Sequence, residues 1–290
     1  MLDAMEWAGA DVTVSEVEQC LARLRMEAEA AGTAQRTSVA THIAWVPEPW
    51  LPAAIEVLRG LAERHPSRTI VLVPEPDASP SAIDAELELS LFPLGEDGRS
   101  ICTETVLLRL RGARAHAPAS IVTPLLISDL PVFCRWRGEP PFGLVEFEQL
   151  LGVVDRLVVD SEEWEDLPFA FKKLAGELDR TAISDIAWQR LLPWRAALAR
   201  LWPGIAEASS VQVAGPHADA LLLAAWLRTR LRRDDLLLDH EEAAALEHVA
   251  VDREPVVPVG LDPQTPSDLL SNELDRFGRD LIYEQALRSF

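Results

Sequence analysis

Cysteine is scarce in this sequence, and long apolar runs are missing. The cysteines are Cys20, Cys102 and Cys134. They form no CxxC pair, which excludes a disulfide scaffold and a thiolate zinc site. No stretch reaches the ~18 uncharged apolar residues of a membrane span, and the acidic N-terminus lacks the basic and apolar segments of a signal peptide. We therefore expect a soluble, reduced, cytoplasmic protein that binds no membrane.

Basic residues are also in deficit. The 290 residues include 27 Lys and Arg against 47 Asp and Glu, so the formal net charge is −20. Such a field repels phosphate backbones and argues against general nucleic-acid binding. The hydrophobic share of 48% is that of a globular protein with a real core, and the length suits two domains or one large α/β domain.

Motifs for catalysis and cofactor binding are absent as well. No GxGxxG follows a predicted strand, and the sequence has no Walker loop, HExxH pair or GxSxG elbow. The six histidines are scattered; His240 and His248 lie among acids, without the further ligands that zinc requires. The sequence thus indicates no catalytic residue, no metal and no cofactor.

The first half of the chain does contain an alternation of helix and strand patterns. Residues 15–31 carry apolar side chains at helical spacing. A β-branched stretch at 38–46, a helix from Leu51 and an apolar stretch at 69–73 together predict a βαβ unit. Further strands are expected at 85–92, 101–110, 131–136 and 156–160, with helices at 117–126 and 144–151.

The second half begins with helical patterns at 164–178 and 186–202. In the second of these, Pro193 either kinks the helix or ends it at Leu192 and begins a new one. A strand at 211–214 and a helix at 219–231 then repeat the strand-to-helix step. We expect the acidic stretch 234–254 to be solvated, followed by a strand at 256–261, a helix capped by Ser267 that buries Phe277, and a short helix around Tyr283.

These patterns predict a layered α/β fold. It should have a mostly parallel sheet with flanking helices, a helical insertion and a smaller C-terminal α/β portion. The expected divisions are an N-terminal helical segment (1–35), an N-terminal α/β domain (36–165) and a C-terminal helical and α/β domain (166–290).

A candidate ligand crevice follows the predicted strand 131–136. Its end carries Arg135, Trp136 and Arg137, at the edge where open α/β sheets bind ligands. Two guanidinium groups beside an indole can hold a phosphate or a carboxylate. Alternatively, both arginines neutralise the acidic segment 139–166.

A second candidate, for an anion, is the turn with Gly215 and His217. It lies between a strand and a helix, where free backbone N–H groups and the helix dipole attract negative charge. The alternative is an ordinary tight turn in which Asp219 caps the helix.

Arginine and tryptophan are concentrated between residues 187 and 233. This stretch has seven arginines and only two acids, Glu207 and Asp219, which is a surplus of five positive charges. The arginines are Arg190, Arg195, Arg200, Arg228, Arg230, Arg232 and Arg233. Because the same stretch holds Trp188, Trp194, Trp202 and Trp226, it has the composition of an interface core. Helix ends and intramolecular ion pairs are the alternative explanation.

The stretch DIAWQRLLPWR at 185–195 resembles the D-[LI]-A-W-x-R-L-x-P-W-R signature of the OpcA family of glucose-6-phosphate dehydrogenase assembly proteins. The PLLISDLPVFCRWRG stretch at 124–138 and the LLSNELDRFGRDLIYEQAL stretch within 267–287 are similar to two further family blocks. Residues 36–74 are similar to the family's early βαβ region, so the resemblance spans about residues 36–287.

The resemblance implies a non-enzymatic partner of glucose-6-phosphate dehydrogenase that favours the active oligomer of that enzyme in the oxidative pentose phosphate pathway. The partner-binding residues that it implies are Asp185, Trp188, Arg190, Pro193, Trp194 and Arg195, with Asp129, Pro131, Trp136 and Gly138. We add Arg135 and Arg137 to this surface. The alternative hypothesis is a sugar-phosphate-binding enzyme or metabolite sensor that uses the Arg135–Arg137 crevice.

Overall fold

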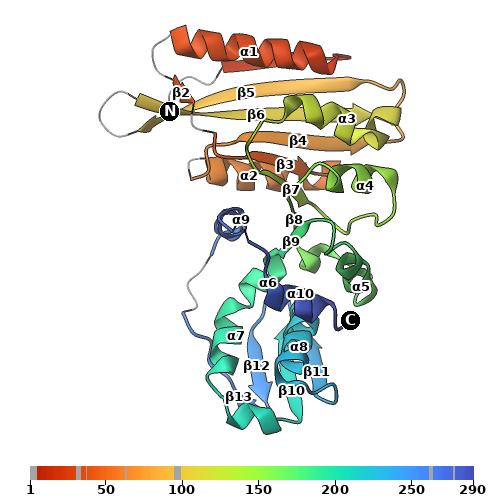
Figure 1. Cartoon of the computed structure of the whole chain (residues 1–290), viewed down its shortest axis with the longest axis vertical. Helices are drawn as coiled ribbons and strands as arrows, with labels where there is room; N and C mark the ends of the chain where they lie inside the picture. The colour runs from red at the N-terminus through yellow and green to blue at the C-terminus, as the bar shows by residue number, and fades with distance from the viewer. Residues whose placement is uncertain are drawn as a thin grey trace. The chain divides into compact units, whose positions relative to one another are not determined.

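The computed structural model describes residues 5–30, 34–36, 38–62, 64–94, 99–260, 264–276 and 278–290. The chain forms two compact units, Met1–Leu157 and Val158–Phe290 (Figure 1). Their boundary falls inside strand β8 (Arg156–Val159). The predicted α/β class is confirmed, and the three expected divisions stay a prediction. In the described part of the chain, no helix is both long and apolar enough to cross a membrane.

The sheet of the first unit is mixed and mostly parallel. Its strand order is β1-β5-β6-β4-β3-β7, with β2 beside β6. β1 pairs antiparallel with β5 and β5 with β6, whereas the other pairs are parallel. The strands are β1 (Met5–Gly9), β2 (Ala34–Arg36), β3 (Thr41–Trp45), β4 (Arg68–Glu75), β5 (Ile83–Leu94), β6 (Arg99–Arg111) and β7 (Val132–Trp136).

The predicted βαβ unit is confirmed. Strand β3, the one-turn η1 (Glu48–Trp50), helix α2 (Leu51–Ala62) and strand β4 follow one another, and β3 and β4 are parallel. Leu51 and Ala54 of α2 pack against Val71 and Val73 of β4. Since neighbouring residues of a strand point to opposite faces, these contacts place α2 on one face of the sheet.

Helix α1 (Val14–Ala30) covers the other face. Arg68 of β4 lies opposite Glu104 of β6 and donates to its carboxylate, Nε to Oε2, at 2.7 Å. Arg25 of α1 binds the same carboxylate through Nε and Nη2, at 2.5 and 2.9 Å. The two guanidinium groups hold the pKa of Glu104 below its usual value, although burial acts in the opposite direction.

The remaining elements of the first unit are short. They are η2 (Gly112–His116), α3 (Pro118–Val122), η3 (Thr123–Leu125) and α4 (Val145–Leu151). The expected helix at 117–126 is therefore α3 continued by η3. Strands β1 and β2 were not predicted. β1 has only five residues, too few for its alternating exposure to stand out from a loop.

The second unit begins within β8, and β9 (Ala182–Asp185) pairs with that strand. Between them lie η4 (Ser161–Glu163) and α5 (Phe169–Gly176). The helix expected at 164–178 thus begins five residues later, after Pro168. A smaller sheet follows in the order β11-β10-β12-β13, formed by β10 (Ser210–Gly215), β11 (Leu237–Glu242), β12 (His248–Val251) and β13 (Glu254–Pro255).

The helical stretch 186–202 is two helices and not one. Helix α6 (Ile186–Arg190) ends before Leu191, and α7 (Leu192–Ala199) has Pro193 in its first turn. Proline has no backbone N–H to donate and is tolerated in the first turn, so restarting the helix costs less than a kink. The second of the two alternatives drawn from the sequence is correct.

The acidic stretch 234–254 is mostly exposed, as expected, but the sequence did not predict that it contains β11, β12 and part of β13. Helix α8 (His217–Leu231) links β10 to β11 in a parallel pair, and β12 adds antiparallel to β10. The acids of β11 are all exposed, whereas Val249 and Ala250 of β12 are buried. An edge strand can carry charge on exposed positions, which masked its strand pattern.

The last segments also differ from expectation. Residues 256–260 form no strand, since Pro258 lacks a donor and Gly260 has a φ of +65°. Helix α9 (Pro266–Leu274) is capped by Thr265 and not Ser267, in a capping box with Asp268. Helix α10 (Leu281–Leu287) is the short helix expected around Tyr283. The expected roles of Leu261 and Phe277 lie outside the described residues.

Candidate functional site

The signature segment, residues 185–195, begins with a buried helix cap. Asp185 is 1% exposed, and its Oδ1 accepts hydrogen bonds from the backbone N–H groups of Ala187 (3.0 Å) and Ser161 (3.1 Å). Its Oδ2 accepts one from the Tyr283 hydroxyl at 3.1 Å. Burial raises the pKa of Asp185 to about 6. Asp185 therefore positions α6 and fastens α10 to it.

Trp188 makes a second connection to the C-terminal helix. Its indole is 2% exposed, and Nε1 donates to Oδ2 of Asp280 at 2.8 Å. Asp280 also caps α10 through the backbone N–H groups of Ile282 and Tyr283. Two of the sequence blocks behind the family resemblance thus bind each other inside the second unit.

The side chains of Trp194 and Arg195, at the end of the signature segment, are also buried. The guanidinium of Arg195 lies 3.5 Å from the Trp188 ring centroid, and its Nη2 donates to the Trp188 carbonyl at 3.2 Å. Burial lowers the pKa of Arg195 to about 10. Trp194 is 5% exposed, and the carbonyl of Pro193 accepts the N–H of Val259. The side chains of Trp188, Trp194 and Arg195 are therefore buried inside the second unit.

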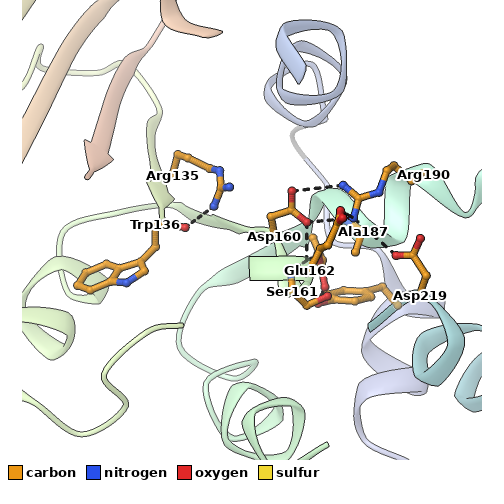
Figure 2. Close-up of polar contacts among 10 residues, drawn as sticks. Arg135, Trp136, Asp160, Ser161, Glu162, Ala187, Arg190 and Asp219 are labelled. Carbon is orange, nitrogen blue, oxygen red and sulfur yellow. Dashed lines mark hydrogen bonds and ion pairs between the residues drawn. The ribbon is translucent and has the colours of Figure 1, made fainter. Parts of the chain in front are cut away.

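Arg190 is surrounded by carboxylates (Figure 2). Its Nη2 lies 3.2 Å from Asp160, 2.6 Å from Glu162 and 3.6 Å from Asp219. Because these ion pairs favour the charged guanidinium more than burial disfavours it, the pKa of Arg190 is raised. Burial raises the pKa of Asp219 to about 7, against the attraction of Arg190. The cluster joins η4, α6 and α8.

The arginines of α8 are partly used inside the unit. Arg228 donates to the Leu236 carbonyl, and Arg233 binds Asp235 and the Ala206 carbonyl. Trp226 is 8% exposed. Among the described residues, the three without an ion pair or a side-chain hydrogen bond in this stretch are Arg200, Arg230 and Arg232, all exposed.

One tryptophan of the stretch remains accessible. Trp202 is 66% exposed and follows Leu201, which is 43% exposed, and the exposed Arg200. We call residues 200–202 the exposed turn; it follows α7 at the lower end of the second unit in Figure 1. Arg233 holds the end of α8 against η5 (Gly204–Glu207), which comes directly after this turn.

The first unit contains a pocket of about 390 Å³ at the carboxyl ends of β3, β4 and β7. We call it the strand-end pocket. Trp45 and Trp136 are register partners on β3 and β7, and their rings stack at 4.7 Å. Trp50 and four prolines, Pro47, Pro74, Pro76 and Pro141, line it further.

The two candidate arginines of this region are separated by the structure. Arg137 lines the pocket, and its guanidinium lies 5.1 Å from the Trp50 ring centroid. Arg135 is 4% exposed and donates to the Trp136 carbonyl. Gly138, with a φ of +77°, also lines the pocket. Asp129 is exposed, and the carbonyl of Pro131 accepts the N–H of Thr41.

Carboxylates lie close to the candidate anion turn. Gly215 ends β10, and its carbonyl lies 2.8 Å from Nε2 of His240. The exposed His217 ring stacks on His240 at 5.2 Å. Glu242 lies 3.7 Å from His240, and Asp219 sits in the first turn of α8 without capping it. These acids disfavour an anion, and the anion site stays a prediction. The alternative of Asp219 as the helix cap is wrong, because no side chain caps α8.

Some residues that line the pocket were not predicted from the sequence. Trp45, Trp50, His116 and Glu146 were not singled out as ligand contacts. A signal did exist, because Trp45 ends a predicted strand just as Trp136 does. Parallel strands bring their carboxyl ends to one edge.

Comparison with known proteins matches both units. Residues 59–176 match the family described as glucose-6-phosphate dehydrogenase subunit N-terminal domain, and residues 181–256 match the corresponding C-terminal domain. The chain belongs to the OpcA family. The resemblance noted in the sequence is thereby confirmed, and the signature segment lies inside the second OpcA match.

Curated OpcA relatives come from cyanobacteria. This chain is 26% identical over 184 residues to a candidate OxPP cycle protein OpcA of Synechocystis sp., an alignment that covers 59% of this chain and 38% of the relative. The OpcA proteins of Synechococcus elongatus and Nostoc punctiforme are 27% and 25% identical over 183 residues, with 59% of this chain and 41% and 39% of those proteins covered. The match therefore spans about two fifths of each relative.

Proposed function

We propose that this protein is a non-enzymatic assembly factor that binds glucose-6-phosphate dehydrogenase and favours the active oligomer of that enzyme. The observation that carries the proposal is the family assignment. Both domain descriptions name a subunit of this dehydrogenase, and together they reach across residues 59–176 and 181–256, one match mainly in each unit. The names of the curated relatives refer to the OxPP cycle, in agreement with this role.

We place the dehydrogenase contact at the exposed turn. The signature segment was the expected docking surface, but Asp185, Trp188 and Arg195 are buried and hydrogen-bonded internally, and Trp194 is buried. Trp202 keeps its indole accessible. Truncating tryptophan and arginine anchors at interfaces often costs 2 kcal/mol or more, so this turn offers the right residue types.

An assembly factor needs only a modest preference for the active state. A tenfold tighter binding to that state shifts its equilibrium by about 1.4 kcal/mol. Two buried side chains in the complex, such as Trp202 and Leu201, supply a free energy of that order.

The test uses purified dehydrogenase with and without this protein. We expect the two proteins to co-elute in size-exclusion chromatography, and the dehydrogenase velocity and oligomeric mass to rise together. Separate elution with an unchanged velocity would overturn the proposal. Heat-denatured protein from the same preparation is the matched control for contaminating activity.

A further inference from the structure

The strand-end pocket lies at a reversal of strand order. β3 lies between β4 and β7, so the chain continues from β3 to one side and later adds β7 on the other. Open α/β sheets bind ligands at the carboxyl ends of their strands where the order reverses in this way. The volume, about 390 Å³, falls in the range of small-molecule sites.

Aromatic rings line part of the pocket. The Trp45 and Trp136 rings are nearly parallel, with an interplanar angle of 11°, and Phe147 packs edge-on against Trp136 at 5.2 Å. These contacts hold the two indoles, which are almost fully buried. Trp50 is 37% exposed, so its ring is accessible to an occupant. An accessible indole suits the C–H face of a saturated ring.

The polar groups of the pocket include both donors and acceptors. The guanidinium of Arg137 only donates, whereas the carboxylates of Glu139 and Glu146 only accept. His116 can do either, and its Nδ1 lies 3.5 Å from Glu146. The fixed charges are one positive and two negative. A hydroxyl group both donates and accepts, so it can pair with the guanidinium and with the carboxylates.

We propose that the strand-end pocket binds a neutral, hydroxyl-rich ring of monosaccharide size. A phosphate ester would place negative charge near Glu139 and Glu146, with one guanidinium to offset it and a protein of net charge −20 around it. The two carboxylates attract an ammonium group and Arg137 repels it, so the cationic sugar glucosamine is titrated beside the other probes, and tighter binding of glucosamine than of glucose would overturn the proposal. Hydroxyls avoid the repulsion that a phosphate meets, and the ring stacks on Trp50. This site acts independently of the dehydrogenase contact, which we place in the other unit.

The test titrates the full chain alone with neutral probes and charged probes. The neutral probes are glucose, mannose, myo-inositol and sorbitol, and the charged ones are glucose 6-phosphate and inorganic phosphate. Saturation-transfer NMR detects binding, and calorimetry gives the dissociation constants. We expect saturable binding of at least one neutral probe and at least tenfold weaker binding of both charged probes. Trp50→Ala should weaken the sugar at least tenfold, whereas Trp202→Ala, the control outside the pocket, should leave it unchanged.

A second variant tests whether the negative charge of the pocket disfavours a phosphate group. Glu146→Gln keeps the size of the side chain but removes one negative charge, so it should weaken the neutral probe and strengthen glucose 6-phosphate. The proposal is overturned if no neutral probe saturates up to tens of millimolar, if inorganic phosphate or its ester binds the native protein more tightly than the neutral probes, or if Trp50→Ala and Trp202→Ala bind alike.

Discussion

Two neighbouring stretches of the second unit have similar composition but differ in burial. The signature segment and the exposed turn are both rich in tryptophan and arginine. In the signature segment, Trp188 donates to Asp280, and Arg195 stacks on the Trp188 ring. In the turn, Trp202 is 66% exposed. The signature segment therefore includes residues that build the fold, and the accessible tryptophan lies a few residues beyond it.

The largest expected effect is on the stability of the signature segment. Trp188→Ala should lower the free energy of unfolding by about 3–5 kcal/mol, because it opens a cavity and leaves Asp280 without its indole donor. Urea denaturation followed by circular dichroism measures this change. A loss below about 1 kcal/mol would show that the buried contacts of this segment do not stabilise the fold.

Arg190→Met should be the next most damaging substitution. It leaves Asp160, Glu162 and Asp219 crowded without their cation, which we expect to cost about 3 kcal/mol. The matched control is Arg200→Met, which removes an exposed guanidinium and should change stability by at most about 0.5 kcal/mol. Equal losses in the two variants would contradict the distinction between the regions.

The acid cluster should also make stability depend on pH. The folded-state pKa of Asp219, about 7, lies above its ordinary value of 3.8. Between these values the folded state keeps a proton that the unfolded chain has lost, so stability falls as the pH rises, by at most about 1.4 kcal/mol per pH unit for this group.

Asp219→Asn should therefore flatten the fall in stability between pH 5 and 7, a window set by the raised pKa of Asp219. Urea midpoints across this range measure the effect. The exposed Asp234→Asn is the control and should keep the native slope. If Asp219→Asn keeps it as well, the carboxyl does not take up a proton on folding.

Trp202→Ala should have the smallest effect on the fold. The indole is mostly exposed, and such substitutions change the free energy of unfolding by about 0.5 kcal/mol or less. The same denaturation experiment measures it beside Trp188→Ala. A large loss would mean that Trp202 belongs to the fold as Trp188 does.

Much of the fold follows from local patterns. The βαβ unit of β3, α2 and β4 was predictable because an apolar strand buried on both faces and an amphipathic helix differ clearly in period. Strand β11 was not predictable, because its acidic residues give no strand pattern and the strand forms by pairing with β10. Such pairing is a long-range property that no local window contains.

The candidate site divides in the same way. That residues 135–137 end a strand at the ligand edge was predictable, and Arg137 does line the pocket. The sequence could not show which of the two arginines lines the pocket, because the Arg135 side chain donates to the Trp136 carbonyl instead. Likewise, the sequence of residues 185–195 does not show that Trp188 and Asp185 form hydrogen bonds with Asp280 and Tyr283, nearly a hundred residues later.

We propose that the exposed turn, and not the signature segment, contacts the dehydrogenase. The most direct measurement is the dissociation constant of the complex for Trp202→Ala, beside Phe169→Ala, which removes another exposed aromatic ring (54% exposed) of the same unit. We predict that Trp202→Ala weakens the complex at least about tenfold, or 1.4 kcal/mol, while Phe169→Ala leaves it unchanged. A complex of native affinity with Trp202→Ala would contradict the account.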